Sequence, residues 1–578
     1  MGFIKPRLAE VEPGWADGRR SDRIRPMAQD WAEAGFGTPD AVLVLYALKI
    51  ALYSLGAALV VSLTPGIGTL GNISTWWTEP IAFQKVVVFT LLFEVLGLGC
   101  GFGPLTMRFL PPIGGFLYWL RPGTIRLPPW PNHLPGTAGT RRTPLDVALY
   151  VGVIAAAIWA LAGSPEVGLG ALAPESGALG TLAVGRVLPL LVVVPLLGLR
   201  DKTIFLAARS EVYLVMCVAF LFGGVDMIVA LKLVMVAIWW GAATSKLNAH
   251  FPFVVSVMLS NSPLLRNKAL KRRFFRSHPD DLTPSRLSAA LAHGGTVFEF
   301  VVPAVLLFST GGALTTAAAA AMIGFHLFII SSLPLGVPLE WNVFMIYGTC
   351  VLFVHDAAWG VGDVSNPLVW ALIASLVVLV AAGNHLPERF SFLVAMRYYA
   401  GNWATSLWSF TPEATERFEH HVVKSATMPA AQLERLYGSE VAESLAFKGY
   451  AFRSMHSHGR ALFGLLPRAL GGDGGTRHVS VDGEFVAGAA LGWNFGEGHL
   501  HHQQLLDALQ ERCAFEPGEV RVIMLESQQM GTPHQRYRLV DAATGEFERG
   551  TVAVADMVCR QPWTDEIPVT LEAEPGAS

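Results

Sequence analysis

The sequence predicts an α-helical multi-pass membrane bundle of about eight to ten transmembrane helices, followed by a C-terminal soluble α+β domain. The first observation behind this fold class is composition: of the 578 residues, 52% are hydrophobic and only 15% are charged. A soluble domain usually carries about 25% charged residues, and the mean hydropathy here is +0.44. The second observation is distribution, because long apolar segments fill residues 41–400 and charge rises afterwards.

Composition also bears on partners. The formal net charge is -3, and the sequence shows no basic stripe with interleaved aromatic residues, so we expect the lipid bilayer and no nucleic acid as a partner. The five cysteines are scattered and none forms a Cys-x-x-Cys pair. This spacing predicts neither a disulfide framework nor a structural zinc site.

Residues 1–40 predict a polar arm on the cytoplasmic side. They include Arg19, Arg20, Arg23 and Arg25, and they lack the short apolar core and small-residue cleavage site of a secretory signal peptide. We therefore expect the first apolar helix, near residue 41, to be retained as a membrane anchor.

The apolar segments predict the transmembrane helices, because a bilayer core of about 30 Å needs about 20 apolar residues per helix. Ten segments qualify as candidates: 41–63, 85–103, 145–163, 187–199, 210–225, 227–246, 289–309, 313–333, 343–356 and 367–383. Two of them, 187–199 and 343–356, are short. A re-entrant segment or a merged pair is therefore an alternative to ten complete spans.

The basic residues predict the orientation. Basic connections at 104–144, 200–209 and 247–288 alternate with connections poor in lysine and arginine at 64–84 and 164–186. The positive-inside rule then puts the N-terminus in the cytoplasm, and ten passes return the C-terminus to the same side.

Several charged or titratable residues fall inside the predicted spans, where each is costly unless it is paired or hydrated. They are Lys49, Glu94, Asp226, Lys232, Lys246, His293, Glu299 and His326. Glu94 lies in the middle of its span, so we expect Lys49 of the preceding helix as its partner, or a role in a proton path. Lys246 ends a long apolar run, where it either snorkels to the interface or acts as a working residue.

Three stretches around Lys246 carry a family resemblance. They are Gly241-Ala-Ala-Thr-Ser-Lys246-Leu-Asn-Ala-His250-Phe, His293-Gly-Gly295, and Gly324-Phe-His326-Leu-Phe-Ile-Ile-Ser-Ser-Leu333 followed by Asn342-Val-Phe-Met-Ile346. In this order they resemble the vitamin K-dependent gamma-carboxylase family and its bacterial relatives, the horizontally transferred transmembrane domain proteins. The resemblance covers about residues 190–350 and implies a multi-pass protein of a bacterial plasma membrane.

The resemblance also implies a function. In that family a membrane lysine deprotonates a reduced quinone, which makes Lys246 the candidate general base, with His293, His326 and Glu299 as catalytic neighbours. Trp239, Trp240 and His250 flank Lys246 and are the candidates for contact with a quinone cofactor. The stretch before the lysine helix departs from the family, so we expect a quinone-linked or other lipid-centred reaction rather than glutamate carboxylation.

A non-catalytic function is the alternative. Several predicted spans are short or interrupted by glycine and proline, which is typical of the broken helices at transport sites. The chain would then bind or transport a lipid or another lipid-soluble small molecule of the cell envelope.

Residues 401–578 predict a cytoplasmic α+β domain, because hydropathy falls near residue 400. Residues 412–423 read as an amphipathic helix. The stretches 477–482, 520–525 and 550–558 read as strands, and the segment 545–550 favours a hairpin turn.

Two histidines of this domain are weak candidates for a metal site. His499 and His502 follow a glycine-rich stretch that we interpret as a strand-to-helix turn able to hold an anion. At positions i and i+3 of a helix they share one face, with Glu497 nearby. The alternative is a solvated cluster at a helix start, and we expect no metal in the membrane part, where His293 and Glu299 stand on different helical faces.

Overall fold

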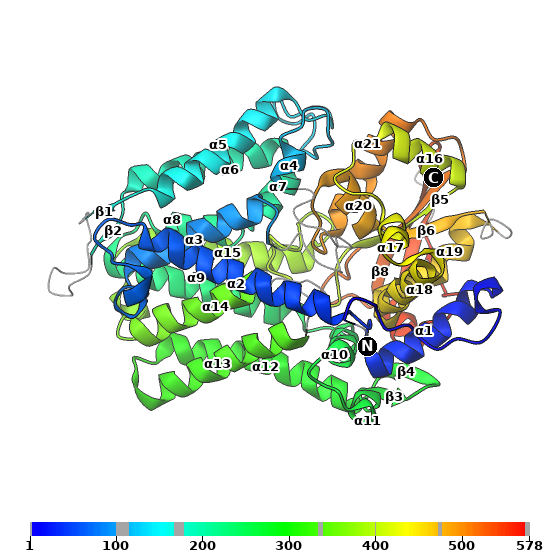
Figure 1. Ribbon diagram of the computed structural model, residues 1–578, viewed down its shortest axis with the longest axis horizontal. Helices are drawn as coiled ribbons and strands as arrows, with labels where there is room; N and C mark the ends of the chain where they lie inside the picture. The colour runs from blue at the N-terminus through cyan, green and yellow to red at the C-terminus, as the bar shows by residue number, and fades with distance from the viewer. Residues whose placement is uncertain are drawn as a thin grey trace.

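The computed structural model describes residues 3–99, 115–166, 179–332, 339–398, 400–471 and 477–572, and the structural statements below concern these residues. Figure 1 shows two parts side by side: long helices fill one half, and helices around a β-sheet fill the other. Cys100 and the segments 104–114 and 167–178 of two predicted loops lie outside the described residues.

The helical half confirms the predicted multi-pass membrane bundle. Six helices are long and apolar enough to cross a membrane: α2 (Asp40–Ser62), α5 (Pro144–Leu161), α9 (Gly224–Ser245), α12 (Arg286–Phe308), α13 (Gly312–Ser332) and α15 (Pro367–His385). Their bounds lie within a few residues of the predicted ranges. Shorter apolar helices run beside them in Figure 1: α3 (Pro80–Val95), α6 (Val184–Arg200) and α14 (Leu339–Gly348), which continues as the π-helical segment η5 (Thr349–His355).

Helix α9 is the centre of the bundle. In its most apolar window 83% of the residues are buried, against 22% to 39% in the other five candidate spans. It packs against α8, α12 and α15. The other spans are equally apolar and face outward, so the central place of α9 follows from its contacts with these helices and not from its hydropathy.

The predicted span 210–225 is wrong. The structure has two short helices instead, α7 (Lys202–Ala207) and α8 (Tyr213–Ala219). Between them Arg209 adopts a positive φ of 51°, and its guanidinium forms a buried ion pair with Glu211 at 2.8 Å. The ion pair and the hydroxyl of Tyr398, which donates to Glu211 at 3.1 Å, satisfy the charges where the helix is interrupted.

The other charged residues of the bundle find polar partners at its helix ends and between its helices. Lys49 forms an ion pair with Glu340 of α14 at 3.1 Å, and its pairing with Glu94 stays a prediction. Lys232 donates to two backbone carbonyls beyond η5, and Asp226 accepts hydrogen bonds from Ser365 and Asn366. Each contact lowers the cost of placing a charge at this depth.

The C-terminal half confirms the predicted α+β class. Its six-stranded antiparallel sheet has the order β10-β9-β8-β7-β5-β6. The strands are β5 (Thr405–Phe410), β6 (Val479–Asp482), β7 (Val520–Leu525), β8 (His534–Asp541), β9 (Gly545–Ala553) and β10 (Thr570–Leu571). Helices surround the sheet: α16 (Pro412–His421), α17 (Pro429–Tyr437), α18 (Ser439–Met455), α19 (Ser457–Leu470), α20 (Gly483–Leu491), α21 (Gln503–Cys513) and α22 (Val554–Cys559).

The predicted hairpin turn at 545–550 is wrong. The register pairs Asp541 with Gly545, so the turn lies at 542–544, where the Asp541 carboxylate accepts hydrogen bonds from two backbone amides. Residues 545–550 are part of β9. The predicted strand 550–558 ends at Ala553, where α22 begins.

Short elements connect these parts. They are η1 (Trp15–Asp17), η2 (Leu70–Thr75), α4 (Phe116–Trp119), β1 (Pro165–Glu166), β2 (Thr181–Leu182), α10 (Phe251–Asn261), α11 (Lys268–Arg272), β3 (Phe275–Ser277), β4 (Asp281–Pro284), η6 (Val361–Asp363) and η8 (Gly498–His501).

The N-terminal arm docks on the C-terminal part. Its helix α1 (Arg20–Ala34) packs against α18 and α10. Asp30 of α1 forms ion pairs with Lys448 of α18 at 2.6 Å and with Arg7 at 2.6 Å. Lys448 is fully buried, so its charge depends on this carboxylate.

Replacing Asp30 with alanine should destabilise the docked arm. Asp30→Ala leaves the buried Lys448 ammonium without its counter-charge, which costs about 3–5 kcal/mol for a buried pair. We expect a lower Tm for the detergent-solubilised protein and faster tryptic cleavage at Arg20 and Arg23. Asp22→Ala is the matched control, because Asp22 pairs with Arg19 at the surface. An arm that stays equally resistant to trypsin in Asp30→Ala would contradict the assignment.

Candidate functional site

The Lys246 region contains a buried ion pair. Lys246, directly after α9, places its amine 2.6 and 2.5 Å from the two carboxylate oxygens of Glu299 on α12. The amine also lies 5.3 Å from the centre of the Phe251 ring. Both side chains are buried, so the structure brings together two of the predicted catalytic residues and gives the amine a carboxylate partner.

His326 and Trp239 form the neighbouring contact. The indole N-H of Trp239 donates to Nε2 of His326 at 3.1 Å. Since the indole is only a donor, Nε2 is the acceptor and Nδ1 carries the proton, which it donates to Oδ1 of Asn342 at 2.8 Å. Both ring nitrogens are thereby used, and this histidine positions helices α9, α13 and α14 relative to one another.

Within the described part of the chain, three other predicted residues form no hydrogen bond or ion pair with the Lys246 amine. His293 is exposed on α12, and Trp240 is partly exposed and donates to the carbonyl of Phe300. His250 is buried where the bundle meets the C-terminal part, with Ser457 at 2.7 Å and Gln528 at 3.0 Å from its ring nitrogens. The structure therefore places His250 in a junction contact rather than beside the amine.

The junction between the bundle and the C-terminal part contains a cavity of about 560 Å³. Its apolar wall comes from helices α6, α7 and α15 and includes Pro195, Leu199, Phe205, Leu206 and Leu379. Its polar wall includes Lys202, Glu388, Arg389, Glu497 and His499. We call this space the junction cavity.

Glu497 holds the polar wall together. Its carboxylate accepts hydrogen bonds from the hydroxyl of Ser391 and from the backbone N-H of Phe392, the latter at 3.0 Å. It also lies 3.4 Å from Nδ1 of His499. One buried carboxylate thus joins the segment after α15 to the segment before η8.

Two cations of the polar wall have no such partner. Within the described part of the chain, the side chains of Lys202 and Arg389 make no hydrogen bond or ion pair, whereas Glu388 pairs with Arg536 at 2.9 Å. Burial lowers the pKa of Lys202, against the opposing effect of Glu497 and Asp201. An anion in the junction cavity would therefore favour the charged form of this amine.

His499 and His502 converge on a carboxylate that sequence reasoning missed. Nε2 of His499 and Nδ1 of His502 lie 3.0 and 3.2 Å from the two oxygens of Glu526. Burial raises the pKa of Glu526, but both histidines outweigh it and hold the pKa well below its ordinary value. Burial lowers the pKa of His499, but Glu526 and Glu497 shift it upward overall.

The predicted helical arrangement of these histidines is wrong. The glycine-rich stretch follows helix α20 rather than a strand, and His499 lies in the 3-10 turn η8, while His502 is the cap residue before α21. Glu526 follows strand β7 and reaches the histidines only through the fold of the sheet. Glu526 is not predicted from the sequence, and its only sign there is its position directly after the predicted strand 520–525.

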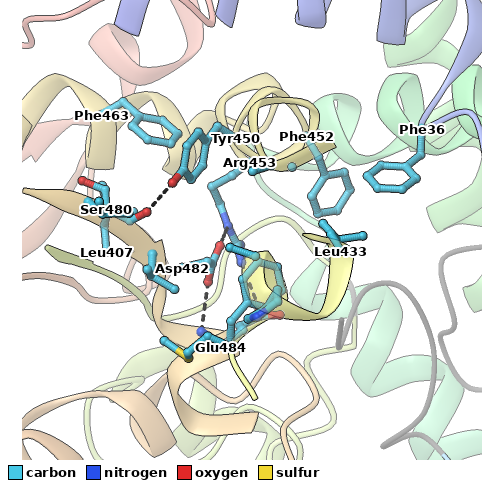
Figure 2. Close-up of a pocket in the computed structure, with 18 of the residues that line it drawn as sticks. Phe36, Leu407, Leu433, Tyr450, Phe452, Arg453, Phe463, Ser480, Asp482 and Glu484 are labelled. Carbon is cyan, nitrogen blue, oxygen red and sulfur yellow. Dashed lines mark hydrogen bonds and ion pairs between the residues drawn. The ribbon is translucent and has the colours of Figure 1, made fainter. Parts of the chain in front are cut away.

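Two further cavities are weaker candidates for a functional site than the junction cavity. The one in Figure 2, of about 100 Å³, has Arg453 between Asp482 and Glu484, and Tyr450 donating to the carbonyl of Ser480. Its arginine is already paired with both carboxylates, which joins α18 to the end of β6 and the start of α20. A third cavity, of about 380 Å³ between α2, α3 and α14, is lined mostly by apolar side chains.

Comparison with known proteins decides the family. Residues 1–572 match the family described as transmembrane protein of unknown function (DUF3556). The chain belongs to this family. No curated protein and no solved structure is detectably similar to it. The relation to the vitamin K-dependent gamma-carboxylase family stays a prediction.

Membership of the DUF3556 family covers the bundle and the C-terminal part together. The junction cavity is lined by residues of both parts, and all of these residues lie within the matched range.

Stability should fall on acidification because of buried histidines at the junction. Burial lowers the pKa of His250 to about 4 and of His456 to about 3, and it holds the pKa of His458 well below its ordinary value. The unfolded chain takes up protons at these rings below about pH 6.5, whereas the folded protein does not. We expect a loss of about 2 kcal/mol per histidine between pH 6.5 and pH 5.

The measurement is Tm against pH in detergent. His250→Gln should reduce the fall in Tm between pH 7 and pH 5, because one of the titrating rings is removed. His420→Gln should leave the fall unchanged, because His420 is exposed. Equal pH dependence in wild type and His250→Gln would rule out the contribution of His250.

Proposed function

We propose that this membrane protein binds an amphipathic, lipid-soluble molecule with an anionic head group in the junction cavity. The observation that carries the proposal is the pair of unpartnered cations, Lys202 and Arg389, on the polar wall of a cavity whose opposite wall is formed by membrane helices. Such a cavity matches a molecule that is charged at one end and apolar at the other.

The depth of the junction cavity supports an apolar tail. Pro195 lies five residues before the end of α6, and Leu379 lies six residues before the end of α15. At 1.5 Å per residue the apolar wall reaches about 8 to 9 Å into the bundle. This distance corresponds to the boundary between head groups and acyl chains, where the outer faces of both helices expose apolar side chains such as Val192 and Val378.

The size of the junction cavity supports a small-molecule ligand. Ligand sites usually have volumes of about 300–1,000 Å³ and a few convergent polar groups within an apolar lining. The junction cavity has about 560 Å³. It holds a head group and the first part of a chain, while the rest of the chain extends into lipid.

The position of the arm supports an orientation. Helices α1 and α18 touch, so the N-terminal arm and the C-terminal part share one side of the membrane. The proposal assigns this side to the cytoplasm of a bacterial plasma membrane, because the basic connections 200–209 and 247–288 belong to it.

Lipid binding should depend on both cations. We expect Lys202→Met and Arg389→Gln each to weaken binding of phosphatidylglycerol about tenfold, since a hydrogen bond to a charged group contributes about 1.5–3 kcal/mol. Native mass spectrometry of the purified protein with phosphatidylglycerol and with phosphatidylcholine measures the bound fractions. Arg266→Gln is the matched control, because Arg266 is exposed outside the cavity. Equal retention of both lipids by wild type would refute an anionic head group.

A second function is favoured by the contact between Lys246 and Glu299. In this proposal Glu299 first takes a proton from the Lys246 ammonium, 2.5 Å away. The neutral amine then acts as the general base and accepts a proton from the hydroxyl group of a reduced quinone. The residues supply the proton acceptor and a dry environment. None of the three cavities described above is lined by Lys246, which makes the junction cavity the stronger candidate for ligand binding.

Variants of Lys246 and Glu299 should distinguish a structural role of this ion pair from a catalytic role. Lys246→Ala leaves the Glu299 carboxylate buried without its counter-charge and should destabilise the protein by about 3–5 kcal/mol. The double variant Lys246→Met with Glu299→Leu removes both charges and should recover most of the Tm. If the pair is catalytic, this stable double variant loses the oxidation of an added ubiquinol or menaquinol by dioxygen, which is measured by the change in absorbance. Wild-type turnover by the double variant would exclude the base.

A further inference from the structure

We infer that His499, His502 and Glu526 bind a divalent transition-metal ion of the zinc class beside the junction cavity. One ligand atom from each of these residues lies within 4.8 Å of the others. Histidine nitrogen and carboxylate oxygen are the ligands that zinc prefers in sites with an open position. Metal binding by these three residues does not require that the junction cavity holds a lipid.

The spacing of the donor atoms fits a tetrahedral ion. Two ligand atoms about 2.0–2.1 Å from zinc lie about 3.3 Å apart when the angle at the metal is tetrahedral. The distances here are 3.0 Å from Nε2 of His499 to one oxygen of Glu526 and 3.2 Å from Nδ1 of His502 to the other oxygen. One ligand atom of each residue lies within 4.8 Å of the others, so the side chains have to close in on the ion when it binds.

His502 presents an unpartnered lone pair to the site. Its Nε2 lies 3.0 Å from the carbonyl oxygen of Thr405, so Nε2 carries the proton that it donates. In the neutral ring Nδ1 is then a bare acceptor, and it has no hydrogen-bond partner although it points to an oxygen of Glu526 at 3.2 Å. These two electron-rich atoms come together only with a cation between them, either a proton on Nδ1 or a metal ion, and the side chain of His502 is only 6% exposed.

Both histidines have an outer partner that sets the ring orientation. Nδ1 of His499 lies 3.4 Å from Glu497, and Nε2 of His502 donates to Thr405. Metal-bound histidines regularly donate their second N-H to a carboxylate or a backbone carbonyl. Nε2 of His499 shares a hydrogen bond with Glu526 at 3.0 Å, so the ion replaces the proton of this hydrogen bond, and it binds Nδ1 of His502 directly.

The site also suggests what the ion contacts, and this step rests on the proposed function. Three protein ligands leave one coordination position of a tetrahedral ion open. His499 lines the junction cavity, so an oxygen of the anionic head group takes the open position. The metal then adds to Lys202 and Arg389 as a third positive contact.

The test measures zinc binding without lipid. The full-length protein, freed of any affinity tag and stripped with a chelator, is titrated with Zn²⁺ alone in detergent. Bound zinc is measured by mass spectrometry of the metal, and affinity by competition with a chromophoric chelator. We expect one zinc ion per chain in wild type and at least about a hundredfold loss of affinity in His502→Ala and in Glu526→Gln.

Two further variants sharpen the result. Glu497→Gln should weaken zinc binding about tenfold to a hundredfold, because it acts through His499. The double variant His420→Ala with His421→Ala removes two adjacent histidines of α16 outside the site and should leave binding unchanged. Glu526→Gln keeps the size of the side chain, so it decides the question if His502→Ala fails to fold.

The outcomes separate the metal site from the lipid site. Stoichiometric zinc binding that is lost in Glu526→Gln supports the metal site whatever lipid is retained. Wild-type zinc binding no stronger than that of Glu526→Gln overturns it, as does an equal loss in the His420 and His421 control. Zinc-dependent retention of phosphatidylglycerol, lost in Glu526→Gln, supports contact between ion and head group, and zinc-independent retention overturns that contact alone.

Discussion

The buried carboxylate of Glu497 is the contact on which the junction between bundle and C-terminal part depends. It accepts hydrogen bonds from Ser391 and Phe392, at the exit of the last membrane helix, and lies against His499 at the entrance to η8. A buried carboxylate is stable only while such partners surround it. Any movement of the two parts that separates these groups leaves the charge uncompensated, so Glu497 fixes the position of one wall of the junction cavity relative to the other.

The same contact connects binding chemistry to the fold. Because Glu497 is engaged by Ser391, Phe392 and His499, it forms no ion pair with Lys202 or Arg389 within the described residues, so both cations can meet an anion in the cavity. His499 in turn faces Glu526, which makes the acidic and basic groups of the junction one connected network. The proposed anion site and the proposed metal site share this network. The membrane helices supply the apolar surface, and residues of turns and helix ends supply the polar groups.

Inside the bundle, buried charged side chains are stabilised by direct ion pairs. Lys246 meets Glu299, Lys49 meets Glu340, and Arg209 meets Glu211, each as a buried pair. The pairs link helices that are distant in sequence or, for Arg209, stabilise an interruption between α7 and α8. Since the attraction of each pair has to repay the desolvation of both ions, these contacts specify which helices are neighbours more than they add stability.

The sequence by itself determined the membrane bundle, the bounds of its six long helices and the α+β class of the C-terminal part, because hydrophobic length and period are local properties. It also singled out Lys246, Glu299, His326, His499 and His502 as costly or reactive residues. Only the tertiary structure decided their partners: Glu299 is 53 positions from Lys246 in the chain, and Glu526 comes from a strand far from the histidines. Side-chain contacts across helices and sheet depend on packing, which no local pattern encodes, and the same reason explains why the break at Arg209 and the junction cavity emerged only from the fold.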